Sequence, residues 1–306
     1  MKLYLAGIYT SNFHKESQLY ARLLPREKGA RDGVQHYLES YHYIHKDSYV
    51  NRLRADGVKV FLDSGAFSAF TKGIDVDMPA YCEYVRRNED IIEKVDGAIC
   101  ASVLDGIGDP LKTWQNQEAM ERLGVRPLPC FHYGEDERYL EWYIARYEYI
   151  TLGGMVPIST PQLFYWLDRL WERYLTDGSG KPRLKVHGFG LTSRSLMERY
   201  PWYSVDSSSW VQIAANGGIF EPNFGVIPIS ETSPAAKKHN GHLDTYPPVQ
   251  REALIRRLEA QGFEVERLRV EYVSRWAYNC WGFTELSDIV SKTQPELFKN
   301  LHMGLF

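Results

Sequence analysis

The feature that most constrains the fold is a repeated pattern, in which a short apolar run leads into a polar loop and then into an amphipathic helical stretch. Seven such runs are predicted strands, over residues 2–8, 58–62, 97–102, 127–131, 149–152, 184–186 and 202–205. Helices are predicted between them, over residues 79–94, 109–123, 135–147, 161–175 and 193–200. Strands that alternate with helices in this way predict a parallel sheet with right-handed crossovers.

The number of these units predicts a (β/α)8 barrel, and a chain of 306 residues suits one such domain over residues 1–306. The eighth strand is predicted at residues 268–273 (LRVEYV). Residues 212–248 are rich in Gly, Pro, Asn and Ser, which predicts a long insertion before that last strand. Residues 249–262 are predicted to form a helix.

Composition excludes several classes of protein. The formal net charge of −3 gives no global basic field, so a nucleic-acid partner would need a local basic patch. The four cysteines form no CxxC or CxC pair, which argues against a zinc ribbon or a disulfide scaffold. The sequence has no apolar window of about 18 residues, so we expect no membrane span and a cytoplasmic location.

Three carboxylates follow predicted strands: Asp63 and Asp206 directly, and Asp105 after two further residues. In a barrel the carboxyl ends of the strands form the catalytic face, so these side chains are candidates for one site. Glycosyl transfer needs such acids, one to attack the anomeric carbon and one to handle the proton of the base. Metal binding is a competing use of the same acids, and helix capping is the purely structural alternative.

Two histidines and a glycine pair also follow predicted strands. His132 and His187 would face the same barrel mouth, where they could contact a heterocycle, although packed histidines are common at such positions. Gly153 and Gly154 could let a ligand approach the backbone closely, or could simply form a strand-to-helix turn.

Taken in order, these segments resemble the tRNA-guanine transglycosylase superfamily, most closely its archaeal branch and the phage enzymes that modify DNA. The resemblance runs from about residue 58 to residue 210. It rests on five segments in the family's order: DSGAF from Asp63, VLD ending at Asp105, LGGMVP from Leu152, HGFG from His187, and VDSSSW containing Asp206.

The resemblance implies a base exchange through a covalent glycosyl-enzyme intermediate. Asp206 would be the nucleophile that attacks C1′, and Asp63 the general acid and base. Residues implied to contact the base are Ser64, Gly65, Phe67, Asp105, His132, Gly153, Gly154, Met155 and His187. Among these, Phe67 and His187 would sandwich the base, and His132 or Tyr133 would replace a family glutamine. The target nucleotide would be flipped out of its stack.

Departures from the family pattern bear on metal and substrate. The family's CxCxxC…H zinc motif is absent, so we expect no metal and no organic cofactor. The RNA-binding extension of the archaeal tRNA enzymes is also not found, which favours a compact phage-type enzyme acting on DNA in the host cytoplasm. Arg251, Arg256 and Arg257 of the helix at residues 249–262 are the candidate nucleic-acid contacts, and a solvated helix face is the alternative.

The resemblance therefore implies a pentosyltransferase that replaces guanine in DNA with a 7-deazaguanine base, of which 7-cyano-7-deazaguanine (preQ0) is the expected one. The expected partners are DNA and the free base, with no membrane, and a homodimer is left open. The alternatives are the same exchange on tRNA, a catalytically silent subunit that only binds nucleic acid, and an unrelated barrel glycosidase.

Overall fold

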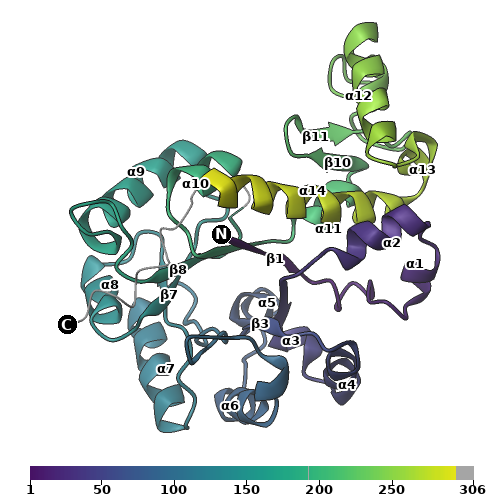
Figure 1. Ribbon diagram of the computed structural model, residues 1–306. Coiled ribbons are helices and arrows are strands. Elements are labelled where there is room, and N and C mark those ends of the chain that lie inside the picture. The colour runs from purple at the N-terminus through teal and green to yellow at the C-terminus, as the bar shows by residue number, and fades with distance from the viewer. Residues whose placement is uncertain (192, 294–306) are drawn as a thin grey trace. The chain divides into compact units, whose positions relative to one another are not determined.

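The computed structural model describes residues 1–191 and 193–293 (Figure 1). The chain divides into two compact units. The first combines Met1–Thr10 and His36–Ser207 with residues 290–293, and the second combines Ser11–Gln35 with Ser208–Ile289. No helix in the described part of the chain is both long and apolar enough to cross a bilayer.

The first unit is built on a curled, seven-stranded parallel sheet in the order β3-β2-β1-β9-β8-β7-β6. The first strand in sequence pairs with the last, because β1 lies between β2 and β9. The strands are β1 (Lys2–Ala6), β2 (Tyr37–Ser40), β3 (Val60–Asp63), β6 (Cys130–His132), β7 (Tyr149–Gly153), β8 (Lys185–Gly188) and β9 (Ser204–Ser207). The predicted parallel α/β architecture is confirmed.

A short segment between the two edges of this sheet pairs with both of them. Leu62 of β3 forms a parallel bridge with Ala101, and Ser102 forms a parallel bridge with Leu128, just before β6. The Leu62 N–H donates to the Cys100 carbonyl (2.8 Å), and the Leu128 N–H donates to the Ala101 carbonyl (2.8 Å). Both edge strands thus find backbone partners in the same stretch of chain.

Residues 97–102, predicted as one strand, take two roles. Ala98–Ile99 forms β5, which pairs antiparallel with β4 (Lys94–Val95), and the following residues make the bridges just described. The tight turn between β4 and β5 uses Asp96 and Gly97, both with positive φ. The core enclosed by the sheet is a cluster of buried side chains: Tyr4, Leu38, Phe61, Val95, Cys100, Leu128 and Tyr149.

Helices surround the strands of the first unit (Figure 1). Three begin at an aspartate whose side chain accepts a bond from a backbone N–H in the first turn: Asp77, Asp109 and Asp136. The helices are α3 (Tyr41–Ile44), α4 (Asp47–Asp56), α5 (Ala66–Thr71), α6 (Met78–Arg87), α7 (Pro110–Arg122), α8 (Glu137–Ile144), α9 (Thr160–Leu170) and α10 (Arg194–Arg199). The helix predicted over residues 79–94 is shorter than expected, because α6 ends at Arg87 and a 3-10 turn (Glu89–Ile91) leads into β4.

The second unit is mostly helical and has its own core, in which Ile219, Leu254, Leu258, Phe263 and Tyr278 are buried together. Its elements are α1 (Gln18–Ala21), α2 (Pro25–Asp32), α11 (Ser209–Ala215), the antiparallel pair β10 (Gly218–Glu221) and β11 (Gly225–Pro228), α12 (Pro248–Ala260), α13 (Val265–Val270) and most of α14 (Tyr272–Thr293).

The strand predicted at residues 268–273 is wrong. Residues 265–270 form helix α13, and α14 begins at Tyr272. The alternation of apolar and charged residues is typical of a strand, yet the buried residues are Val265 and Leu268, which are three apart and therefore share one face of a helix. Residues 212–248 accordingly do not precede a last strand. They follow β9 and contain β10 and β11.

Candidate active site

The parallel sheet brings the predicted site residues to one rim. Asp63 is the last residue of β3, His132 of β6 and Gly153 of β7, while His187 and Asp206 lie next to the last positions of β8 and β9. Because parallel strands all end on the same side of a sheet, these side chains share its carboxyl edge. All of them belong to the first unit.

Asp63 is held by the tight turn that follows it. Its Oδ2 accepts a hydrogen bond from the Gly65 N–H (3.0 Å), and its Oδ1 accepts one from the Ser102 hydroxyl (3.5 Å). Gly65 has φ +77°, and a Cβ there would lie 2.5 Å from the Cβ of His42, so only glycine fits. Burial raises the pKa of Asp63 to about 6, and the carboxylates of Asp105 and, less strongly, Asp206 add to this shift. Asp63 can therefore gain and lose a proton near neutral pH.

Asp206 is buried and positioned by two donors. Its Oδ1 accepts a hydrogen bond from the Gly190 N–H (2.9 Å) and lies 3.3 Å from His187 Nε2. On the other side of the imidazole, His187 Nδ1 lies 2.8 Å from the Ser204 hydroxyl, which in turn lies 2.7 Å from the hydroxyl of Tyr149. The result is a buried polar chain from Tyr149 to Asp206 that fixes the carboxylate in one orientation.

His187 is placed differently from its predicted role as a stacking partner for a base. The ring is fully buried and stacks on Phe61, with the ring centroids 4.4 Å apart. Phe189 packs edge-on at 4.7 Å. This packing leaves the ring faces to the protein, and it favours a role in orienting Asp206. Phe67, the other predicted stacking residue, is 68% exposed in α5.

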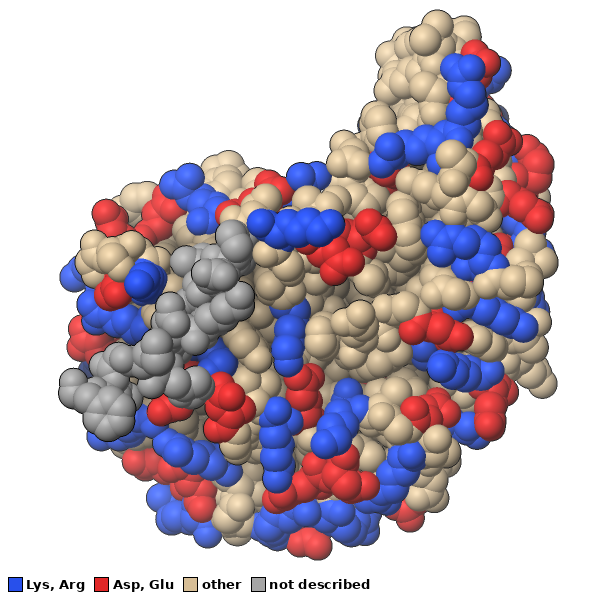
Figure 2. Space-filling view, in the orientation of Figure 1, with Lys and Arg blue, Asp and Glu red and all other residues tan. Residues whose placement is uncertain are grey.

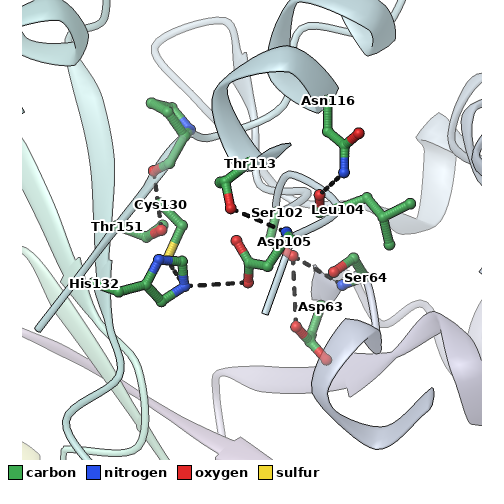
Figure 3. Close-up of polar contacts among 12 residues, drawn as sticks. Asp63, Ser64, Ser102, Leu104, Asp105, Thr113, Asn116, Cys130, His132 and Thr151 are labelled. Atoms are coloured by element: carbon green, nitrogen blue, oxygen red, sulfur yellow. Dashed lines mark hydrogen bonds and ion pairs between the residues drawn. The ribbon is translucent and has the colours of Figure 1, made fainter. Parts of the chain in front are cut away.

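Asp105 and Ser64 carry buried polar atoms that are not satisfied by the chain. Asp105 Oδ1 and Ser64 Oγ are both buried and have no hydrogen-bond partner within the described residues. The backbone around them is well anchored, because the Ser64 N–H donates to the Ser102 hydroxyl (2.8 Å) and the side chain of Asn116 donates to the Leu104 carbonyl (2.6 Å). In Figure 3 the Asp105 carboxylate lies between His132 on one side and Ser64 and Asp63 on the other. Buried atoms without partners at a strand edge are where a polar ligand binds favourably.

A pocket of about 510 Å³ opens beside Asp105. Its wall also includes Phe70, Ile74, Lys112 and Asn116. Phe70 and Ile74 are 61% and 54% exposed, so the pocket offers apolar surface next to a carboxylate. Its volume is in the range of small-ligand sites.

His132 contacts three other groups. Its Nε2 lies 3.4 Å from Cys130 Sγ and 3.5 Å from Asp105 Oδ2, and its Nδ1 lies 2.9 Å from Glu135 Oε1. Burial lowers the pKa of His132, but Cys130 and Asp105 outweigh it and raise the pKa overall. One ligand atom from each of Asp105, Cys130 and His132 lies within 4.8 Å of the others, so these three could hold a metal ion.

Packing and backbone conformation account for glycine at positions 153 and 154, apart from their predicted contact with a base. A Cβ at Gly153 would lie 2.9 Å from both Cys130 Sγ and His132 Cδ2, and Gly154 has φ +68°. The backbone of this turn is therefore pressed against the side chains of β6, and the predicted contact of Gly153 and Gly154 with a base stays a prediction. Met155, also predicted to contact the base, is buried.

Cys130 and Glu135 were missed by the sequence analysis. Their signal is a spacing: Cys130 and His132 are two apart in a strand and so point to the same side, and Glu135 follows three residues later. The search for CxC and CxxC pairs does not detect a cysteine paired with a histidine.

The predicted nucleic-acid contacts lie in α12 of the second unit. Two of these arginines are ion-paired, Arg257 with Glu221 (2.7 Å) and Arg256 with Glu252 (3.3 Å). On the face that Figure 2 shows, basic and acidic side chains are interspersed. Arg256 and Glu252 are both exposed, so their pair contributes little energy and a phosphate could replace the acid, whereas Glu221 is fully buried and fixes Arg257 more firmly. The role of Arg251, Arg256 and Arg257 stays a prediction.

No family model and no curated protein matches this sequence. The assignment of a function therefore depends on the residues and the geometry of the site.

Proposed function

We propose that this protein is a transglycosylase that exchanges guanine in DNA for a 7-deazaguanine base, with 7-cyano-7-deazaguanine as the expected substrate. The observation that carries the proposal is the contrast between two carboxylates on one rim. Asp63 is poised to exchange a proton near neutral pH, and Asp206 is held rigidly by a backbone N–H and an imidazole. Two carboxylates in different environments are what glycosyl transfer through a covalent intermediate requires.

In the first half of the proposed reaction, a carboxylate oxygen of Asp206 attacks C1′ of the target nucleotide. The C1′–N9 bond breaks as the C1′–O bond forms, and protonated Asp63 supplies a proton to the departing guanine. In the second half, Asp63 removes the N9 proton of the incoming base, whose nitrogen attacks C1′ and releases Asp206. The free energy of one glycosidic bond is carried into the other, so no cofactor is needed for the exchange.

Base recognition is assigned to the two buried rim atoms that have no partner within residues 1–191 and 193–293. Asp105 Oδ1 is an acceptor for the N–H groups on the Watson–Crick edge of a guanine-like base, and the Ser64 hydroxyl can donate to the neighbouring oxygen. Phe67 is exposed enough to stack on the face of the base, and such stacking contributes about 1–3 kcal/mol per base.

The proposal includes a closed (β/α)8 barrel. The parallel bridges from Leu62 to Ala101 and from Ser102 to Leu128 support an eighth strand around residues 100–103, between β3 and β6. That strand overlaps the one expected at residues 97–102, and β2, which was not expected, would take the place of the strand expected at residues 268–273. Asp105 would then lie on the same rim as the other acids, because it follows that strand by two residues.

Nucleoside mass spectrometry tests the proposal. Purified protein is incubated with 7-cyano-7-deazaguanine and either duplex DNA or unmodified tRNA, and each nucleic acid is then digested. We expect the deazaguanine deoxynucleoside in the DNA digest and its absence with Asp206→Asn. The ribonucleoside alone would transfer the activity to tRNA. Neither product, with DNA still bound, would support a silent nucleic-acid-binding subunit, and cleavage of a sugar polymer would support a glycosidase.

A further inference from the structure

We propose that Asp105, Cys130 and His132 form a binding site for a divalent cation of the zinc class. Strand β6 presents Cys130 and His132 to the same side, and Asp105 approaches them from the loop that precedes α7 (Figure 3). With a metal bound, the three residues would offer a thiolate, an imidazole nitrogen and a carboxylate oxygen. A thiolate together with an imidazole selects zinc-like ions over Mg²⁺ or Ca²⁺, which prefer oxygen alone.

The two distances from His132 Nε2 to the other donor atoms match those around a tetrahedral ion, and all three donor atoms lie within 4.8 Å of one another. Zinc lies about 2.0–2.3 Å from N, O and S ligands, which places neighbouring ligand atoms about 3.3–3.5 Å apart in a tetrahedron. His132 Nε2 lies 3.4 Å from Cys130 Sγ and 3.5 Å from Asp105 Oδ2. A direct charge-assisted hydrogen bond between an imidazolium and a carboxylate would be shorter, about 2.7–2.9 Å. The distance of 3.5 Å between His132 Nε2 and Asp105 Oδ2 is therefore too long for a strong ion pair and suits a cation bound by both residues.

Glu135 orients the imidazole as a metal ligand. Its Oε1 lies 2.9 Å from His132 Nδ1, and its Oε2 accepts a hydrogen bond from the His132 N–H (2.9 Å). A proton on Nδ1 that is donated to a carboxylate leaves the lone pair on Nε2, which is the nitrogen that faces Cys130 and Asp105. Carboxylate–histidine–metal arrangements of this kind are common at zinc sites.

The neighbouring backbone packs closely against Cys130 and His132, and it is anchored next to Asp105. Gly153 of the neighbouring strand lies so close to Cys130 and His132 that a Cβ would be 2.9 Å from each. The Thr113 hydroxyl, from α7, accepts a hydrogen bond from the Gly106 N–H (3.0 Å) and anchors the residue after Asp105. Both β7 and α7 thus hold the ligand residues in place, which a chance contact of polar side chains does not require.

Three protein ligands leave a fourth position for water or a substrate atom. Asp105 would use Oδ2 for the cation and keep Oδ1, which has no partner within the described residues, for a ligand. The metal proposal does not depend on the proposed exchange reaction, because it concerns binding by the protein alone.

Metal content and cobalt spectroscopy test the site without any nucleic acid or base. The full chain, without a polyhistidine tag, is loaded with Zn²⁺ or Co²⁺, dialysed and analysed by inductively coupled plasma mass spectrometry and absorbance. We expect one equivalent of metal per chain, and for Co²⁺ a thiolate-to-metal charge-transfer band with intense d–d bands of tetrahedral coordination. Cys130→Ser should abolish the charge-transfer band, and Glu135→Gln should weaken binding about 10- to 100-fold while keeping all three ligands.

Cys82→Ser is the matched control, since Cys82 is also a buried cysteine but lies in α6, outside the cluster. This variant should keep the full equivalent of metal and the band. Parent protein that retains no metal, or a charge-transfer band that persists in Cys130→Ser, would overturn the proposal. If Cys130→Ser loses its circular dichroism, Glu135→Gln decides, because unchanged affinity in that variant would also contradict the assigned site. A metal-bound protein that performs no exchange would leave this inference standing and reject the proposed function.

Discussion

The two ends of the parallel sheet differ in how completely their polar and charged side chains are paired. At the amino end, Lys2 pairs with Glu93, and the same carboxylate accepts a hydrogen bond from the buried hydroxyl of Tyr4 (2.8 Å). Lys185, at the start of β8, pairs with Asp96 of the β4–β5 turn. At the carboxyl end, Asp63 has a raised pKa, and Asp105 and Ser64 keep buried atoms that have no partner in the described chain.

The difference separates residues that hold the sheet together from residues kept for a ligand. Polar groups at the amino end satisfy one another, so replacing them should change stability and leave chemistry intact. At the carboxyl end, Asp105 and Ser64 each keep a buried atom without a partner within the described residues, which costs stability and leaves these atoms available for binding. Each of the following experiments tests one side of this contrast.

The largest effect is expected from Asp206→Asn at the carboxyl end. The amide can still accept the hydrogen bond from the Gly190 N–H, so the fold should persist, but it cannot form the glycosyl ester. We expect base exchange to fall by about 10³-fold or more, with an unchanged thermal midpoint. Exchange at the parent rate would remove Asp206 as the nucleophile.

At the amino end of the sheet, Glu93→Ala should lower stability and leave the exchange activity unchanged. This change leaves the buried Tyr4 hydroxyl and Lys2 without their carboxylate, and it should lower the free energy of unfolding by about 2–3 kcal/mol. The rate of exchange per folded molecule should stay the same. Glu93→Gln is the control that keeps a hydrogen-bond acceptor, and it should recover part of the loss in a denaturant titration.

Asp63→Asn should make the protein more stable at high pH. The pKa of Asp63 is about 6 in the fold against 3.8 in the unfolded chain, so the folded state binds the proton more tightly. The contribution to stability is full below about pH 4 and is lost as the pH rises through about 6. The variant should therefore exceed the parent by about 2 kcal/mol at pH 8 and match it at pH 4.

Denaturant titrations at both pH values measure this difference, and base exchange measured alongside should be lost. The groups that face Asp63 include Asp105, Asp206, Ser40 and the Gly65 N–H, and none of them is changed in the variant. Equal stability of variant and parent at pH 8 would mean that the Asp63 carboxylate is not desolvated.

The smallest effect is expected from a methyl group at Gly153. Gly153→Ala should cost about 1–2 kcal/mol, because the Cβ presses on Cys130 and His132 and those side chains must shift. Gly29→Ala in α2 is the matched control, since a Cβ there meets nothing within 4 Å and alanine favours a helix. A thermal midpoint that falls in both variants, or in neither, would contradict the packing argument.

The fold was predictable where strands are buried on both faces. Residues 149–152 (YITL) are apolar except for Thr151, and β7 is buried along its whole length. Strand β2 was missed because its four residues (YLES) include Glu39, which is 1% exposed. The charge is accommodated by hydrogen bonds from the Tyr9 N–H (2.6 Å) and the Thr10 hydroxyl (2.6 Å), and burial raises the pKa of Glu39 to about 7. Tyr9 and Thr10 are distant from Glu39 in the sequence, so a local sequence pattern cannot predict these hydrogen bonds.

The candidate site was predictable as a set of positions but not as a set of contacts. That Asp63 and Asp206 end strands followed from the order of apolar runs and polar loops. That His187 faces Asp206 depends on the register of β8 against β9, in which His187 pairs with Ser204. The neighbours of Cys130 depend likewise on how β6, β7 and the segment around Asp105 align, and no spacing within the sequence specifies that alignment.

Position 153 and position 206 should tolerate substitution under different conditions. At position 153 a side chain is excluded because its Cβ would press on Cys130 and His132, whereas position 206 is restricted, under the proposed reaction, by what Asp206 does to a substrate. A library screened only for soluble, folded protein should keep glycine at position 153 and let position 206 vary. A library screened for modified DNA should keep both. Comparing the two screens would therefore separate residues that are needed for folding from residues that are needed for the exchange reaction.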